Sequence, residues 1–270
     1  MLKDKKIVVI GMGEMGEILI NNILINGLVS RENLVGSDKS KQKRDLIKEQ
    51  YQINTFSSNP TAVTHKDIII LAIEPKVIRS VIEEIKDKLF PEQLIVSVVA
   101  GVSTKMIEEQ IGKQISVVRV VPTPNAKIGE SITILCQGRF ANEEGKEIAK
   151  IIFNGLGLVE TLRREDLMNS VSALSVIPAY TYTMIEALTD GGVLTGLPRD
   201  LTKKIVSQNI LGACKMVFQT KKHPAELKDI LTTPGGLTIE GLRIIEKGNI
   251  RSTFIESIIS VERKCKHLIQ

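Results

Sequence analysis

Three glycines near the start of the chain, Gly11, Gly13 and Gly16, have the spacing Gly-x-Gly-x-x-Gly directly after the apolar run Val8-Val9-Ile10. The first permits a tight strand-to-helix turn, the second lets a phosphate approach the backbone, and the third allows a helix to pack closely on a strand. A helix that starts here presents unpaired N–H groups and a positive dipole end, which favour an anion. The pattern therefore predicts a dinucleotide site, although a strand–helix turn without a ligand has the same spacing.

The residues at the end of the next expected strand, 33–37, would determine whether the site prefers NAD or NADP. Asp38 stands where an acid binds a ribose 2′-hydroxyl in NAD sites. The residues around it are hydroxyl-bearing or basic, which suits the 2′-phosphate of NADP: Ser37, Lys39, Ser40 and Lys41. The two signals conflict, and a solvated helix start would also explain them. We interpret the segment as an NADPH site, with NADH as the alternative.

A second candidate anion site lies far along the chain, at Pro234-Gly235-Gly236-Leu237-Thr238. The backbone N–H groups of such a segment, at the start of a helix, can hold a carboxylate. A plain Pro-Gly-Gly turn capped by Thr238 explains the same residues equally well, so both interpretations stay open.

Composition excludes several other classes of function. Three cysteines and three histidines are scattered, with no Cys-x-x-Cys, so we expect no metal site and a reducing, cytoplasmic location. The 36 basic and 31 acidic residues are interspersed, and tryptophan is absent, which favours a solvated lysine-rich surface over a nucleic-acid site. We also expect no apolar run long enough to span a bilayer. The predicted partner is a small molecule, not nucleic acid or membrane.

Strands and helices alternate over the first part of the chain. Apolar runs followed by helix-like segments predict a doubly wound parallel sheet of the Rossmann type, with its ligand at the carboxyl ends of the strands. The expected strands are 6–10, 33–37, 67–72, 94–99, 116–120, 131–136 and 158–161.

The strand pattern stops after about residue 162. We therefore expect a dinucleotide-binding domain at 1–162 and an all-helical dimerisation and substrate domain at 163–270. The expected helices are 163–173, 178–191, 199–218, 224–231, 238–247 and 249–268. A domain this small buries a limited fraction of its surface alone, so its many apolar faces predict dimerisation.

Several motifs, in one order, closely resemble those of the pyrroline-5-carboxylate reductase family, and the resemblance runs nearly end to end. In the first half they are the glycine loop, Ala72-Ile73-Glu74-Pro75 and Ala100-Gly101-Val102. In the helical half they are Glu186-Ala187-Leu188-Thr189-Asp190-Gly191-Gly192-Val193, Gly196-Leu197-Pro198-Arg199, Leu211-Gly212-Ala213-Cys214-Lys215-Met216, His223-Pro224, Leu227-Lys228-Asp229 and Pro234-Gly235-Gly236-Leu237-Thr238-Ile239.

The resemblance implies NAD(P)H-dependent reduction of a cyclic imine to proline, in the last step of proline biosynthesis. It also implies a homodimer that assembles further, up to a decamer of dimers. The substrate carboxylate would bind the Gly236-Leu237-Thr238 backbone, and the Thr238 hydroxyl would face the imine nitrogen. The cofactor contacts would be Met12, Gly13, Glu14, Met15, Ser37, Lys39, Asn59, Ala72, Ile73, Pro75, Val98, Val99 and Ala100.

Three segments depart from the family pattern. Ser175-Val176-Ile177-Pro178 lacks two glycines and is one residue shorter, Pro122-Thr123-Pro124-Asn125 replaces Pro-Asn-Thr-Pro, and Glu74 replaces a lysine. The pocket is therefore expected to differ in shape. A proline-forming enzyme, a paralogue for another cyclic imino acid and a non-catalytic dinucleotide-binding relative all stay open. A hydroxyacid dehydrogenase is disfavoured, because its catalytic base would have to be His223, which we interpret as stabilising a helix start.

Overall fold

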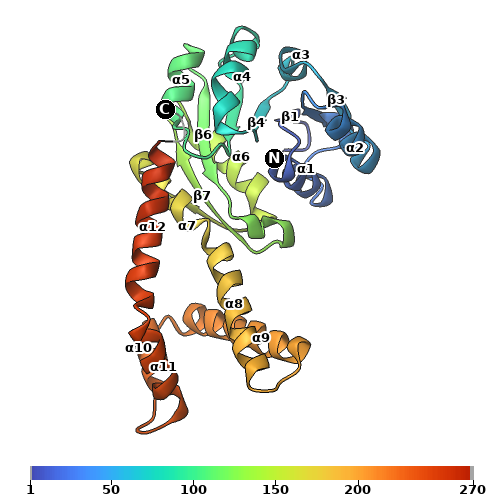
Figure 1. Cartoon of the computed structure of the whole chain (residues 1–270). Helices are drawn as coiled ribbons and strands as arrows, with labels where there is room; N and C mark the ends of the chain where they lie inside the picture. Colours follow the sequence, from blue (N-terminus) through green and yellow to red (C-terminus); the bar gives the residue numbers. More distant parts are fainter. Residues whose placement is uncertain (1, 268–270) are drawn as a thin grey trace. The chain divides into compact units, whose positions relative to one another are not determined.

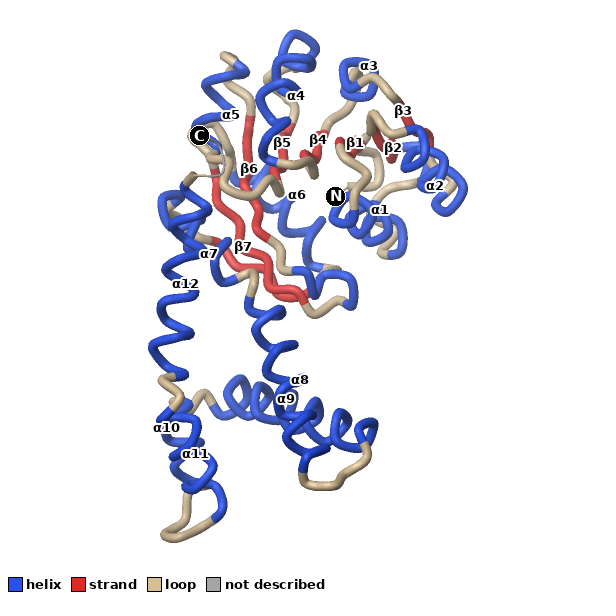
Figure 2. Tube along the Cα trace, viewed as in Figure 1, coloured by secondary structure: helices blue, strands red, loops and turns tan. Residues whose placement is uncertain are grey.

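The computed structural model describes residues 2–267. Contacts group the described chain into two compact units. The first holds the residues up to Ser175 and those from Val261 onward, and the second is Val176–Ser260. All described strands, red in Figure 2, belong to the first unit, and the last of them ends at Thr161. The short helix α7 (Met168–Leu174) follows the last strand and groups with the sheet.

The described strands of the first unit form one sheet in the order β3-β2-β1-β4-β5-β6-β7-β8. Strands β1 to β6 pair in parallel, whereas β7 pairs antiparallel with β6 and parallel with β8. The predicted parallel sheet is confirmed for β1 to β6. It is wrong for β7 and β8, which run antiparallel to the other strands. The bounds are β1 Ile7–Ile10, β2 Leu34–Ser37, β3 Asn54–Phe56, β4 Ile68–Leu71, β5 Leu94–Ser97, β6 Ser116–Val121, β7 Ser131–Gln137 and β8 Gly157–Thr161.

Helices cover both faces of this sheet (Figure 1). Side chains alternate along β1, so Ile7 and Val9 join one buried cluster while Val8 and Ile10 join the other. Full burial of each such side chain contributes roughly 1.5–3 kcal/mol, which explains the unbroken apolar strands. The helices of this unit are α1 Glu14–Ile25, α2 Lys41–Tyr51, α3 Asn59–Val63, α4 Ile78–Ile85, α5 Thr104–Ile111 and α6 Glu143–Asn154, with short 3-10 turns η1 Arg31–Asn33, η2 Pro75–Val77, η3 Lys86–Lys88, η4 Pro124–Ile128 and η5 Glu165–Leu167.

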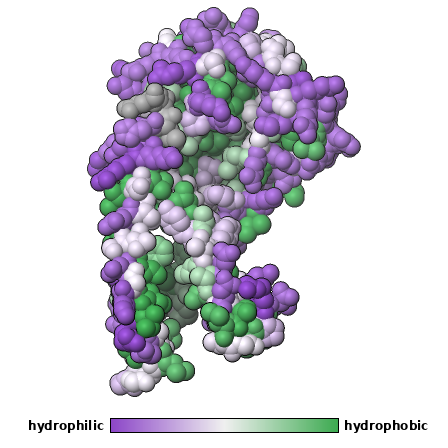
Figure 3. Space-filling view, viewed as in Figure 1, coloured by the Kyte–Doolittle hydropathy of each residue, from purple (hydrophilic) through white to green (hydrophobic). Residues whose placement is uncertain are grey.

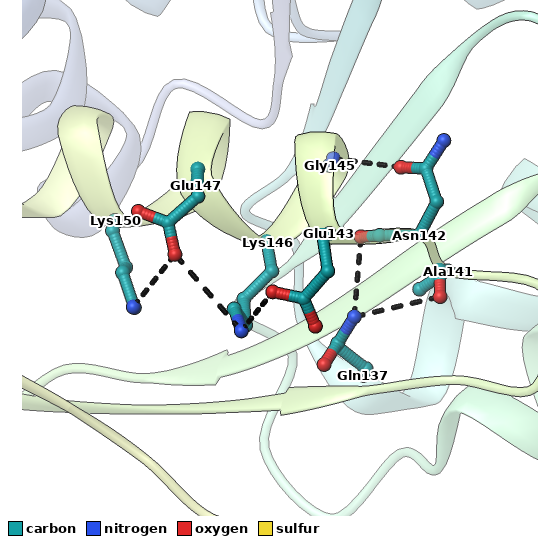
Figure 4. Close-up of polar contacts among 8 residues, drawn as sticks. All are labelled: Gln137, Ala141, Asn142, Glu143, Gly145, Lys146, Glu147 and Lys150. Atoms are coloured by element: carbon teal, nitrogen blue, oxygen red, sulfur yellow. Dashed lines mark hydrogen bonds and ion pairs between the residues drawn. The ribbon is translucent and has the colours of Figure 1, made fainter.

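The end of β7 is joined to the start of α6 by polar contacts (Figure 4). Gln137 Nε2 donates to the carbonyl oxygens of Asn142 at 3.1 Å and Ala141 at 3.4 Å. The Asn142 side chain accepts from the Gly145 N–H at 2.8 Å and so caps the helix. These bonds fix the point at which α6 crosses over from β7 to its parallel neighbour β8.

The second unit is helical and exposes much of its apolar surface. It contains α8 Ile177–Leu194, α9 Arg199–Thr220, α10 Pro224–Ile230, α11 Leu237–Lys247 and most of α12 Ile250–Lys266. Hydrophobic side chains gather on the face of these helices seen in Figure 3. Leu194 is 89% exposed and Phe218 is 71% exposed, although both are large and apolar. The described end of α12 lies at Lys266, and residue 268 of the predicted helix lies outside the described residues.

One helical stretch is longer and more apolar than we expected from the sequence. Glu165–Leu194 is long and apolar enough to cross a membrane, judged by length and composition only. The expectation that no run reaches that length is therefore wrong. One such helix is weak support for a membrane location, and the exposed apolar side chains that follow it in the second unit are equally suited to a contact between protein chains.

Candidate functional site

The glycine loop has the backbone that its spacing predicts. Gly11 has φ +94°, and a Cβ there would collide with the carbonyl oxygen of Ala72. A Cβ on Gly16 would collide with the carbonyl oxygen of Gly11, so this glycine permits the close return of α1 onto the strand end. A Cβ on Gly13 would meet nothing within 4 Å, and no side chain caps α1 at this residue. Gly13 thus leaves the first N–H groups of α1 open to a ligand.

A cavity of about 300 Å³ lies beside this loop, at the carboxyl ends of β1, β2 and β4. It contains seven of the residues expected to bind the cofactor: Gly11, Gly13, Ser37, Lys39, Asn59, Ala72 and Ile73. Ile10, Val77 and Val81 add an apolar wall. The cavity combines an apolar wall, a helix N-terminus and lysines, a combination that suits the adenosine and phosphate part of a dinucleotide.

Other expected cofactor residues do not line this cavity. Met12 is buried beneath Gly36, Glu14 lines a different groove, and Gly16 is packed against Gly11. Met15 and Val98 pack against the hydrophobic core, and Val99 lies within it. Pro75 starts η2 next to the cavity wall, and Ala100 is exposed beyond β5.

Three charged lining residues are absent from the predicted contacts, namely Lys43, Glu74 and Lys76. Lys76 Nζ lies 2.6 Å from Glu74 Oε2, and Lys43 Nζ lies 3.8 Å from Asp38 Oδ2. The exposed Glu74 has a lowered pKa and Lys76 a raised pKa, in both cases mainly because of their mutual hydrogen bond. Glu74 was marked in the sequence by its departure from the family pattern, whereas Lys43 and Lys76 have no sequence signal beyond their position shortly after β2 and β4.

Asp38 has a structural role that its position alone does not reveal. Its Oδ2 accepts from the Met12 N–H and its Oδ1 accepts from the Ser40 N–H, both at 2.9 Å. The carboxylate therefore braces the glycine loop against the start of α2. It still lines the cavity, where its remaining lone pairs can accept a ribose hydroxyl.

The predicted carboxylate site lies at the start of α11 in the helical unit. Gly235 has φ +68°, and Gly236 is the N-cap of α11 without a side-chain cap. The interpretation of Thr238 as the cap is therefore wrong, because Thr238 is the second residue of the helix. Leu237 and Thr238 are exposed, so the first N–H groups of α11 have no side-chain acceptor in the described chain and can bind an anion.

Two of the unusual segments form ordinary local structure. Val176 has φ −85° and ψ −6°, and Ile177 is the first residue of α8, so neither member of the β-branched pair that replaces the glycines needs a glycine conformation. Pro124 starts η4, and the Thr123 N–H before it donates to Ser131 Oγ at 3.0 Å.

His223 has the role expected of it. It is the N-cap of α10, and its Nδ1 accepts from the Ala225 N–H at 3.2 Å. This bond confirms the interpretation of His223 as a residue that stabilises a helix start.

Comparisons with known proteins cover both parts of the chain. Residues 165–268 match the family described as pyrroline-5-carboxylate reductase dimerisation, and residues 6–101 match NADP oxidoreductase, coenzyme F420-dependent. The pyrroline-5-carboxylate reductase of Arabidopsis thaliana is 34% identical, over 98% of this chain and 96% of the relative. The enzyme of that name from Escherichia coli is 30% identical, over 98% of each chain.

Solved structures agree with these relatives. Plasmodium falciparum pyrroline carboxylate reductase, with NADP bound, has a TM-score of 0.91 and 31% identity and covers all of both chains. The Coxiella burnetii pyrroline-5-carboxylate reductase has a TM-score of 0.88 and 29% identity, over 98% of this chain and 99% of the other.

The sheet, the glycine loop and the cavity at the strand ends define a Rossmann-type oxidoreductase with an added helical part. Within the Rossmann-type oxidoreductases, two findings identify the family of this chain. The relatives align over nearly the whole chain, and the dimerisation family matches its helical part. The chain belongs to the pyrroline-5-carboxylate reductase family.

Proposed function

We propose that this chain is an NAD(P)H-dependent oxidoreductase that reduces 1-pyrroline-5-carboxylate to L-proline, the last step of proline biosynthesis. The observation that carries this proposal is the 30–34% identity to relatives of that name over 98–99% of the chain. These relatives do not favour another cyclic imino acid as substrate or a non-catalytic role. The ordinary helical backbone at Val176 and Ile177 removes one reason for expecting a different pocket.

We place NADPH, rather than NADH, in the cavity beside the glycine loop. The open backbone at Gly13 and the uncapped start of α1 suit the pyrophosphate, while Ser37, Lys39 and Asn59 suit the ribose and its 2′-phosphate. Bound NADPH supplies a hydride. Met12, Glu14, Met15, Gly16, Pro75, Val98, Val99 and Ala100 remain proposed cofactor residues that support or flank the cavity.

The substrate would bind at the start of α11. Gly235, Gly236, Leu237 and Thr238 offer backbone N–H groups to its carboxylate, and the Thr238 hydroxyl is assigned to the imine nitrogen. A proton on that nitrogen makes the adjoining imine carbon (C2 of the pyrroline ring, which becomes C5 of proline) electrophilic, so that a hydride can add there. Most of the catalysis then comes from orienting two reactants, an effect worth on the order of 7–11 kcal/mol in well-aligned systems.

Cofactor binding and substrate binding are assigned to different parts of the sequence. We propose residues 1–162 as the dinucleotide-binding domain and 163–270 as the dimerisation and substrate domain, assembled as a homodimer and further into a decamer of dimers. The exposed apolar side chains of the helical part, and the match of residues 165–268 to a dimerisation family, support the homodimer. Three free cysteines fit the cytoplasm as the compartment.

An assay of the purified protein tests this function. We expect NADPH absorbance to fall when 1-pyrroline-5-carboxylate is added, and proline to accumulate in equal amount. The same panel should include NADH and a six-membered cyclic imino acid. Protein that binds NADPH but gives no rate above background with either imine would refute the proposal.

Thr238 is tested in the same assay. Thr238→Ala should lower turnover by about 10- to 100-fold, because a hydrogen bond to the reacting nitrogen is lost. Thr238→Ser keeps the hydroxyl and is the matched control, which should retain most of the activity. Equal turnover in wild type and Thr238→Ala would remove this residue from its assigned role.

A further inference from the structure

Every lysine that lines the cavity beside the glycine loop is paired with a carboxylate. Lys43 faces Asp38 and Lys76 faces Glu74, and both of these acids line the cavity themselves. Lys39 is different, because its partner Glu84, 2.9 Å away, reaches it from helix α4 and lies behind the lining. Glu84 therefore contacts no ligand itself and acts on this cavity through the residues that it holds and through its charge.

Glu84 holds two lining residues at once. Its Oε1 accepts from Lys39 Nζ at 2.9 Å and its Oε2 accepts from Asn59 Nδ2 at 2.8 Å. The Asn59 Oδ1 in turn accepts from the Ser37 hydroxyl at 2.8 Å. Ser37 is fully buried and Asn59 is 5% exposed, so this part of the chain of bonds is fixed by packing. Ser37, Asn59 and Lys39 thus form one network that ends on the carboxylate of Glu84.

The network matters to the two nicotinamide cofactors in different ways. A phosphate monoester has a charge of about −1.5 to −2 at neutral pH and attracts lysine strongly. A 2′-phosphate at this end of the cavity would compete with Glu84 for Lys39 and would be repelled by the Glu84 charge. A free 2′-hydroxyl has no such competition, because it can bond to Asn59 or Asp38 without displacing the lysine. The pKa of Glu84 is lowered, mainly by the bond from Lys39, so its charge persists at neutral pH.

We propose that Glu84 is a positioning residue that sets the selectivity between NADPH and NADH, by restraining Lys39 and Asn59 and reducing the attraction for a 2′-phosphate. The inference rests on the proposed cofactor site. It explains how one cavity can combine the acid typical of NAD sites with the lysine and serine typical of NADP sites. The Glu84 carboxylate behind the lining reduces the attraction of Lys39 for a 2′-phosphate. The enzyme therefore accepts both cofactors, with a smaller preference for NADPH than Lys39 alone would give.

The test compares binding of the two cofactors to the full-length protein. Glu84→Gln removes the charge and keeps one acceptor oxygen, which can serve Lys39 or Asn59 but not both, because the other position becomes an N–H donor. The ratio Kd(NADH)/Kd(NADPH) should rise about two- to fivefold, the range expected for a partly exposed ion pair. Adenosine 2′,5′-bisphosphate should gain affinity relative to 5′-AMP by a similar factor. Glu84→Ala, which also suits a helix, should change both ratios in the same direction.

Two controls separate this effect from a general change in charge or fold. Glu83→Gln on the same helix changes the net charge equally, but Glu83 pairs with Lys86 and not with the cavity, so both ratios should stay constant. In a Lys39→Met background, Glu84→Gln should lose most of its effect.

The outcomes distinguish this inference from the proposed function. Wild-type protein that binds neither NADPH nor NADH would overturn the cofactor site itself. Wild-type protein that binds both, with unchanged ratios in Glu84→Gln and Glu84→Ala, would overturn only the role of Glu84. A similar rise in the Glu83→Gln control would overturn it as well, because the effect would then come from net charge.

Discussion

Gly11 and Gly13 differ in what a methyl group would meet at each position. At Gly11 a Cβ would collide with backbone and φ is positive, so the residue is needed for the turn itself. At Gly13 the Cβ would point into open space beside the uncapped start of α1. One glycine thus serves folding and the other serves the approach of a ligand.

This difference gives a prediction about single substitutions. Gly11→Ala should lower the free energy of unfolding by about 2 kcal/mol or more, because the turn cannot relax without moving β4. Gly13→Ala should stay within about 1 kcal/mol of wild type and yet weaken NADPH binding at least about tenfold. Urea unfolding and a fluorescence titration measure the two effects. Equal stability of the two variants would contradict the assigned roles.

Because the Cys136 thiol is buried, we expect the free energy of unfolding to fall in alkaline solution. Burial, and then the charge of Glu165, raises the pKa of Cys136 to about 11 from the ordinary value of 9.0. Between pH 9 and 11 the unfolded chain therefore loses a proton that the folded chain keeps. This contribution is fully present below pH 9 and is lost as pH rises towards 11, to a total of roughly 2–3 kcal/mol.

Urea unfolding at pH 8 and pH 10.5 checks this expectation. Cys136→Ala removes the titrating group, so its stability should fall less between the two pH values than that of wild type. Cys214→Ala changes an exposed cysteine and should keep the wild-type difference. A wild-type loss equal to that of Cys136→Ala would show that the buried thiol has no such effect.

Residue types and spacing predicted the glycine loop and much of the cavity but could not give the direction of a side chain. Asp38 has the position of a ribose-binding acid, and its carboxylate turns back to two backbone N–H groups. Glu84 is 46 residues from Asp38 in an amphipathic helix, and only the fold brings it to Lys39. No local pattern in the sequence contains that contact.

At the scale of secondary-structure elements, the start of α5 is fixed by a residue from a distant segment. Glu165 in η5 accepts from both the backbone N–H and the hydroxyl of Thr104, the latter at 2.7 Å. Asn169 in α7 accepts from the buried Arg119 of β6 at 2.9 Å. These bonds attach the segment after the last strand to the sheet, and they explain why α7 groups with the first unit.

Removing the Glu165 carboxylate should therefore destabilise the first unit. Glu165→Ala leaves the buried Thr104 without its acceptor, and we expect a loss of about 1–3 kcal/mol in the free energy of unfolding. Asp166→Ala removes only an exposed ion pair with Arg164 and should stay within about 0.5 kcal/mol. Urea denaturation measures both. A Glu165→Ala variant as stable as Asp166→Ala would show that this attachment is not needed.

Elements buried on both faces were predictable, and exposed or reversed ones were not. The continuous apolar runs of β1, β4 and β5 signal their strands without ambiguity. Strand β3 was not predicted, because Asn54–Phe56 is short, partly exposed and at the sheet edge. A strand pattern also carries no direction. The short connection from Val121 to Ser131 was the available sign that β7 runs antiparallel, since parallel neighbours need a crossover of a dozen or more residues.

At the scale of the whole molecule, the two units differ in how well they bury their apolar residues. The first has a large hydrophobic cluster on each face of the sheet and a smaller third one around Val121, Cys136 and Met168. The second leaves side chains such as Phe218, Ile230 and Phe254 exposed. The dimer that we propose accounts for this surface, and the exposed apolar side chains of α8 within the stretch Glu165–Leu194 suit it equally.

The central claim is that this chain transfers a hydride from a nicotinamide to the imine carbon of 1-pyrroline-5-carboxylate. The most direct test supplies NADPH deuterated at both C4 positions and analyses the product by mass spectrometry and NMR. We predict proline with a single deuterium on C5, formed in step with NADP⁺. Proline that carries no deuterium, or no proline above the enzyme-free control, would contradict the claim.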